Sequence, residues 1–82
     1  MNKEKLINIL QPHYREILDD QQLILTDNLT ADDVETWDSL NHILLLVKCE
    51  EVLSVKFKAE EVAELINFGE FIDLILYKLN NG

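Results

Sequence analysis

The chain has 82 residues, which suffices for one domain and no more, so we expect residues 1–82 to form a single domain. Hydrophobic residues make up 48% and charged residues 28%, a balance typical of a compact helical domain and not of a disordered tail. The formal net charge of −9 disfavours binding to nucleic acids and anionic membranes, because both present phosphates. Basic protein surfaces are the expected partners, although acidic surfaces also simply aid solubility.

The amino-terminal residues lack the long apolar core of a signal peptide. The longest wholly apolar run, residues 43–47, is far shorter than the roughly 20 residues that a membrane span needs. We therefore expect a cytoplasmic protein. Its single cysteine, Cys49, excludes an internal disulfide, and an apolar helical setting predicts a buried, unreactive thiol.

Residues 3–18 are predicted to form the first helix, because apolar side chains recur there at helical spacing. These side chains are Leu6, Leu10, Tyr14 and Ile17. Pro12 lies within this pattern, and a proline inside a helix costs about 3 kcal/mol. We therefore expect the helix to be kinked or divided near Gln11.

Residues 19–38 have no helical period and are predicted to form a long connection, a kind of segment that is often functional. Three leucines are placed to hold this connection against the core: Leu23, Leu25 and Leu29. The acidic residues of the segment lack the spacing and glycine of a calcium loop. His13, His42 and Cys49 also lack metal-ligand spacing, so no metal site is expected.

Three further helices are predicted. The second runs over residues 39–53, with Asp38 as its cap and an apolar stripe formed by Leu40, Ile43, Leu44 and Val47. An extended link over residues 54–58 points Val55 and Phe57 inward, and residues 58–65 form a short third helix. The fourth begins at Asn67, which has capping-box spacing with Glu70, and the final Asn-Asn-Gly is expected to end it. The expected fold is an all-α four-helix bundle with a long loop between the first two helices.

The most informative segment is Glu35-Thr36-Trp37-Asp38-Ser39-Leu40. It places one hydroxyl at the end of an acidic loop and at the beginning of an apolar helix. At such a position, unpaired backbone amides and the positive end of the helix favour an attached phosphate. Taken alone, Ser39 would be an ordinary serine at a helix N-terminus, where serine is common.

At this point the chain resembles the acyl carrier protein family over nearly its whole length. The hallmark Asp-Ser-Leu is present as Asp38-Ser39-Leu40, and Trp37 precedes it, as in many discrete carriers outside housekeeping fatty-acid synthesis. The order and spacing of later segments agree as well, over residues 43, 50–51, 55–57, 59–65 and 67–72. The resemblance implies a carrier, not an enzyme.

The resemblance also implies a covalent cofactor. A phosphopantetheinyl transferase would attach the 4′-phosphopantetheine arm of coenzyme A to Ser39, and Asp38 and Leu40 would help it recognise the site. The arm would carry acyl groups as thioesters to acyl-loading and acyl-processing enzymes, as in fatty-acid or polyketide biosynthesis. We expect a monomer. Ser39 and His42 lie one turn apart like a nucleophile and its base, but no acid or oxyanion site accompanies them.

The second helix is the expected docking face. Leu44 stands where carriers of fatty-acid synthesis are usually acidic, and Lys48 adds a positive charge. We therefore expect dedicated partner enzymes with an apolar central contact, in a polyketide-like, lipid or surface-polysaccharide pathway. The docking candidates are Trp37, His42, Leu44, Lys48 and Glu51, with Asn41 and Leu45 also considered by position. The alternatives to docking are core packing for Leu44 and Leu45 and anchoring of the loop for Trp37.

A short acyl chain would lie in the apolar interior beside the second and third helices. The candidate lining residues are Ile43, Val47, Val62 and Ile66, whose alternative role is ordinary core packing. Two other functions remain open. A peptidyl or aminoacyl carrier shares the fold and the modification, but more often has Gly-Gly or Gly-His before the serine. An unmodified helical adaptor would receive no prosthetic group.

Overall fold

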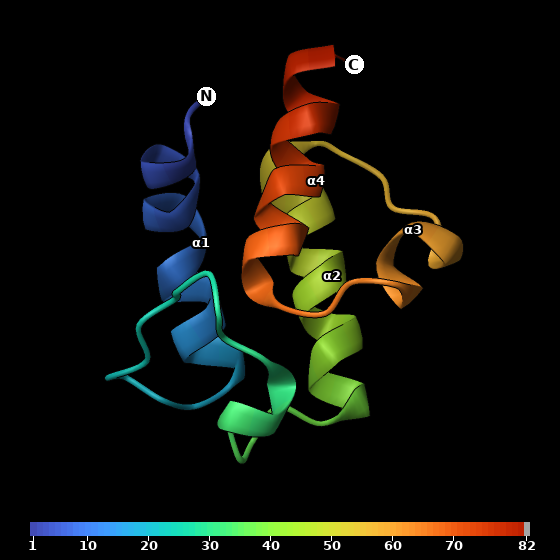
Figure 1. Ribbon diagram of the computed structural model, residues 1–82. Helices are drawn as coiled ribbons and strands as arrows, with labels where there is room; N and C mark the ends of the chain where they lie inside the picture. Colours follow the sequence, from blue (N-terminus) through green and yellow to red (C-terminus); the bar gives the residue numbers. More distant parts are fainter. Residues whose placement is uncertain (82) are drawn as a thin grey trace.

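The computed structural model describes residues 1–81, and over this range it is helical, without strands. Its elements are α1 (Lys3–Ile17), the short 3₁₀ helix η1 (Ala31–Asp33), α2 (Ser39–Leu53), α3 (Ala59–Ala63) and α4 (Phe68–Asn81). The helices α1, α2 and α4 form the bundle, and α3 lies at its side (Figure 1). The predicted all-α fold, with its long first connection and short third helix, is confirmed. The predicted helix stop falls partly on Gly82, which lies outside the described residues.

Helix α1 is continuous. The side chain of Asn2 caps it by accepting a hydrogen bond from the Lys5 amide at 2.9 Å. Pro12 lies inside the helix on its exposed side, so the prediction that the helix is divided near Gln11 is wrong. The opposite face buries three large apolar side chains, Leu6, Leu10 and Tyr14, each contributing about 1.5–3 kcal/mol. This burial exceeds the cost of one interior proline, which is about 3 kcal/mol.

The long connection, residues 19–38, lies against the bundle as predicted. Its leucines at positions 23, 25 and 29 are buried, and Val34 joins them. Two side chains of α1 satisfy its backbone: Arg15 Nε donates to the Leu23 carbonyl at 2.8 Å, and Gln11 Oε1 accepts from the Leu25 amide at 3.0 Å. The segment is therefore fixed by both apolar burial and hydrogen bonds.

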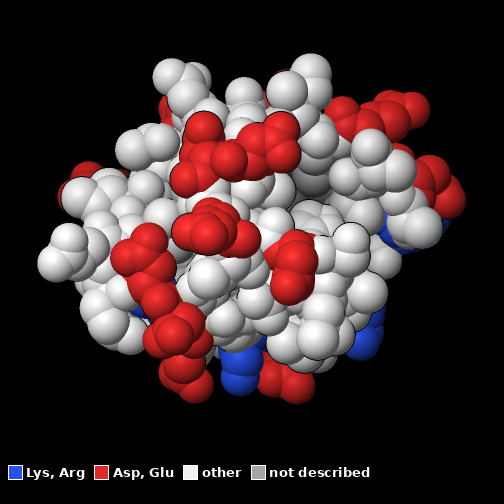
Figure 2. All heavy atoms as spheres, turned by 90° about the horizontal axis from the view of Figure 1, so that it is seen from below, with Lys and Arg blue, Asp and Glu red and all other residues white. Residues whose placement is uncertain are grey.

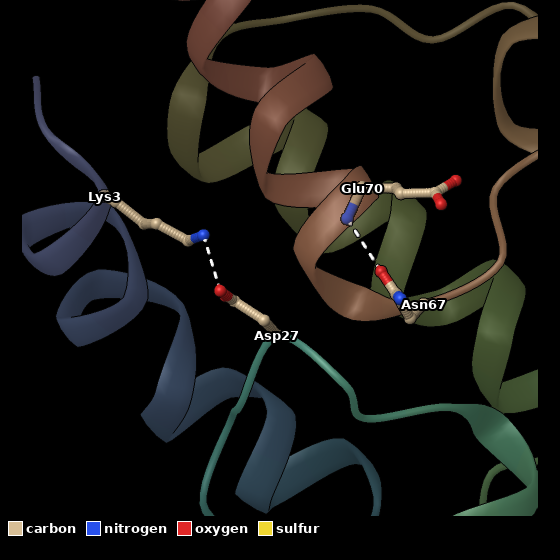
Figure 3. A network of polar contacts seen from close by, with 4 residues as sticks. All are labelled: Lys3, Asp27, Asn67 and Glu70. Atoms are coloured by element: carbon tan, nitrogen blue, oxygen red, sulfur yellow. Dashed lines mark hydrogen bonds and ion pairs between the residues drawn. The ribbon is translucent and has the colours of Figure 1, made fainter.

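The same connection also holds the beginning of α4. The carbonyls of Leu29 and Asp27 accept from the amides of Phe68 at 2.8 Å and Gly69 at 2.9 Å. The Asp27 carboxylate forms an ion pair with Lys3 Nζ at 2.8 Å, and the Asn67 side chain accepts from the Glu70 amide at 3.0 Å (Figure 3). The predicted cap at Asn67 is confirmed, and the N-terminal amides of α4 find partners outside their own helix.

Gly69→Ala is expected to destabilise the protein, although this exchange normally stabilises a helix by up to about 1 kcal/mol. A Cβ at Gly69 would lie 3.0 Å from both the Cβ and the carbonyl oxygen of Asp27, so the loop backbone would have to move. We expect a loss of about 1–3 kcal/mol, measured by urea denaturation. Asp73→Ala, at an exposed position of α4, is the control. A higher urea midpoint for Gly69→Ala would contradict the prediction, because it would show that the loop moves aside at little cost.

Helix α2 begins at Ser39 and ends at Leu53 as predicted, but it presents a different face to the core. The fully buried residues are Leu45 and Cys49. The predicted stripe faces outward, with exposed fractions of 65% for Leu40, 56% for Ile43 and 45% for both Leu44 and Val47. The five consecutive apolar residues 43–47 point to all sides of the helix, so apolar spacing alone does not show which side is buried.

Cys49 is buried as predicted and lies next to the buried Tyr14. Burial raises the pKa of the Cys49 thiol to about 12, because the apolar surroundings disfavour the thiolate. Burial also raises the pKa of Tyr14 well above its ordinary value, and the nearby thiol adds to this effect. Both groups are therefore neutral in the folded protein at neutral pH, which agrees with an unreactive thiol.

Candidate functional site

Ser39 is the first residue of α2 and is exposed. The helix cap around it is well defined: Asp38 Oδ1 accepts from the Asn41 amide at 2.8 Å, and the Asp38 carbonyl accepts from the His42 amide at 2.9 Å. The Asn41 side chain donates to the Thr36 carbonyl at 2.8 Å. These bonds tie the end of the loop to the first turn of α2 and fix the backbone on both sides of Ser39. The predicted cap at Asp38 is confirmed.

The amides of Ser39 and Leu40 precede the first helical hydrogen bond, which the His42 amide makes. At a helix N-terminus such amides and the helix dipole favour an attached anion. The surrounding surface is acidic. Figure 2 shows the end of the molecule at which α2 begins, with carboxylates spread over it and the visible basic side chains near its edge. A basic protein surface would therefore complement this end.

A hollow of about 320 Å³ lies beside the first turns of α2, between η1, α3 and the start of α4. Two of the four predicted lining residues, Val62 and Ile66, contact it. The other two, Ile43 and Val47, do not line it and are exposed on the outside of α2, so that part of the prediction is wrong. On the α2 side the hollow is lined instead by the exposed His42, the buried Leu45 and the half-buried Leu46.

Sequence reasoning missed the remaining walls of the hollow. These come from distant segments and include Tyr14, Leu29, Trp37, Leu65, Phe68 and Phe71. The aromatic residues form one packed group, in which Tyr14 meets Phe68 edge to face at 5.4 Å between ring centroids. Apolar residues at these positions signalled a core, but no local pattern showed that they meet around an open space.

The predicted docking residues differ in how exposed they are. Leu44 and Glu51 are exposed, and Lys48 is half-buried with its Nζ 3.7 Å from the Glu51 carboxylate. Leu45 is buried in the core, so the prediction that it is exposed for docking is wrong. The alternative, core packing, is confirmed for this residue. Leu44 is not packed in the core. The positive charge of Lys48 is thus paired within α2.

Trp37 is half-buried and anchors the loop. Its ring packs edge-on against Tyr14 at 5.8 Å between centroids and an angle of 78°. Its other neighbour is the exposed His42: the rings are stacked at 6.3 Å, and Trp37 Nε1 donates to His42 Nδ1 at 3.2 Å. The anchoring alternative for Trp37 is confirmed, whereas its role in docking stays a prediction.

Within residues 1–81, no cluster of three or more His, Cys, Asp or Glu side chains is arranged to hold a metal ion. Over the same range, no helix has both the length and the apolar character needed to cross a bilayer.

The sequence matches no protein-family model and is not significantly similar to any curated protein compared with it. The structure is similar to the solution NMR structure of a holo acyl carrier protein from Geobacter metallireducens. The two superpose with a TM-score of 0.84 and share 36% sequence identity, over 90% of this chain and 85% of the other.

A four-helix bundle with this loop, together with that level of identity, defines the class of a small carrier protein. The chain belongs to the acyl carrier protein family. Members of this family are carriers and not enzymes, and the chain is therefore not an enzyme.

Proposed function

We propose that Ser39 is the attachment site of 4′-phosphopantetheine and that residues 1–82 form a single carrier domain. The observation that carries this proposal is the exposed position of Ser39 at the capped N-terminus of α2. The residue is exposed, as a modifying enzyme requires, while the cap formed by Asp38 and Asn41 fixes the backbone that bears it. Membership of the acyl carrier protein family supports the proposal, as does the holo form of the similar structure.

The residues around Ser39 fit this group. The amides of Ser39 and Leu40 lie where a phosphate is favoured, and Leu40 is largely exposed beside it. When bound, the group supplies a flexible arm whose thiol carries an acyl group as a thioester. We propose that a phosphopantetheinyl transferase recognises Asp38 and Leu40. The carboxylate of Asp38 also caps α2, so removing it costs about 1 kcal/mol of stability in addition to any effect on recognition.

The hollow beside α2 is the proposed shelter for a short acyl chain. Val62 and Ile66 lie on its α3 side, and Leu45 and Leu46 on its α2 side. His42, one turn after Ser39, also lines it, so the hollow begins close to the proposed attachment site. Its volume of about 320 Å³ suits a small guest.

Acyl-loading and acyl-processing enzymes are the proposed partners, and the exposed face of α2 is the proposed docking surface. The outward residues Leu40, Ile43, Leu44 and Val47 give this face an apolar centre. Trp37, His42, Lys48 and Glu51 are the polar and aromatic candidates around it. An apolar centre favours dedicated partners in a specialised pathway, of polyketide-like, lipid or surface-polysaccharide type. The net charge of −9 disfavours self-association, which supports a monomer.

Incubation with coenzyme A and a broad-specificity phosphopantetheinyl transferase tests the attachment. The intact mass of the wild-type chain is expected to rise by one phosphopantetheine, and Ser39→Ala is expected to abolish the increase. Ser54→Ala is the matched control, because Ser54 is the other serine of the chain and lies exposed at the far end of α2.

Two outcomes would contradict the proposal. A folded wild-type chain that gains no mass would be an adaptor without a prosthetic group. A mass gain that persists in Ser39→Ala would place the modification elsewhere.

A further inference from the structure

The hydrogen bond between Trp37 and His42 determines which ring nitrogen of the histidine carries hydrogen. An indole nitrogen only donates, so His42 Nδ1, at 3.2 Å from Trp37 Nε1, must accept and cannot carry a hydrogen itself. In a neutral imidazole the hydrogen is then on Nε2. The contact therefore leaves His42 with an N–H donor, on Nε2, that Trp37 does not engage.

His42 and Ser39 belong to the same first turn of α2. His42 lies three residues after Ser39, and side chains of a helix lean toward its N-terminus over the preceding turn. Trp37 lies two residues before Ser39, and its ring is itself fixed edge-on against the buried Tyr14. The stacked Trp37 and His42 rings thus connect the segments on either side of Ser39.

We propose that His42 is a positioning residue for the phosphate on Ser39: its Nε2–H donates to a phosphate oxygen, and the hydrogen bond from Trp37 keeps that donor available. This inference rests on the proposed attachment at Ser39. Hydrogen bonds to charged acceptors are stronger than those to neutral ones, so a phosphate is a suitable partner for a partly solvated imidazole. Since His42 also lines the hollow, an arm held at both residues starts out on the side of α2 that faces it.

The test uses the holo chain, prepared enzymatically and checked by intact mass, with phosphorus NMR as its readout. Relative to wild type, His42→Phe is expected to shift the phosphodiester resonance, because the ring then has no donor. Trp37→Phe is expected to shift it in the same direction, since phenylalanine keeps an aromatic ring against Tyr14 but cannot donate to His42. His42→Gln restores an N–H donor and is expected to leave the resonance close to wild type.

His13→Gln is the matched control, because His13 lies on α1 and belongs to neither the Trp37 contact nor the hollow. A second measurement uses the unmodified chain, in which long-range proton–nitrogen NMR is expected to show His42 with hydrogen on Nε2. Circular dichroism verifies that each variant is folded.

A phosphodiester resonance that is unchanged in His42→Phe would overturn the inference, as would a wild-type His42 with hydrogen on Nδ1. Either result leaves the proposed function intact, because the mass gain at Ser39 is established first. A wild-type chain without that mass gain would overturn both.

Discussion

Ile72→Ala is expected to lower the free energy of unfolding by about 2–5 kcal/mol, the usual cost of removing a large buried aliphatic side chain. Ile72 lies on α4, is fully buried, and belongs to the core that α4 shares with α1. The loss combines the transfer free energy of the removed methyl groups with a cavity that the rigid helices do not fill.

The expected loss is large compared with the total free energy of unfolding. A domain of 82 residues has an expected stability of about 4–12 kcal/mol, so this variant approaches the limit of folding. Ile24→Ala is the matched control, because the same side chain is 65% exposed in the long connection. Urea denaturation should show a midpoint near wild type for the control and a much lower one for Ile72→Ala. Equal losses would mean that Ile72 does not lie in the core.

Alkaline pH is expected to destabilise the fold through Cys49 and Tyr14. The pKa of the Cys49 thiol is about 12 in the folded protein and near 9.0 when exposed, and the pKa of Tyr14 is raised in the same direction. A raised folded-state pKa contributes stability that is complete below the unfolded pKa and is lost as the pH rises toward the folded one. Stability should therefore fall from about pH 9 upward.

Ionisation of the cysteine thiol in the unfolded chain accounts for about 2–3 kcal/mol of this loss at pH 11. Urea denaturation between pH 8 and 11 measures the slope of the free energy of unfolding against pH. Cys49→Ala and Tyr14→Phe should each make it shallower, even though both lower the stability at neutral pH, because each removes one ionising group. A slope that neither substitution changes would show that other groups cause alkaline unfolding.

The helix ends were predictable because capping is local. Asp38 and Asn67 are short polar residues directly before apolar segments, and each side chain accepts from an amide three residues later, as that sequence pattern predicts. The inward leucines of the long connection were equally predictable, because few apolar residues lie there among polar ones. Resemblance to a known family placed the candidate serine, which composition and periodicity did not single out.

Other features depend on the assembled fold. The face that α2 buries was not predictable from residues 43–47, since each side of the helix there is apolar and the positions of α1 and α4 decide between them. The continuity of α1 through Pro12 depends likewise on packing along its opposite face. The hollow joins residues from widely separated segments, and its existence follows from tertiary structure alone.

Trp37 is an intrinsic fluorescent probe close to the proposed attachment site at Ser39. It is the one tryptophan of the chain, it lies two residues before Ser39, and it lines the hollow while resting on Tyr14. Indole emission responds to neighbouring polarity and to quenching groups, so the proposed attachment of a prosthetic group, entry of an acyl chain and docking of an enzyme should each change it. All three events can then be followed in real time on the unlabelled protein.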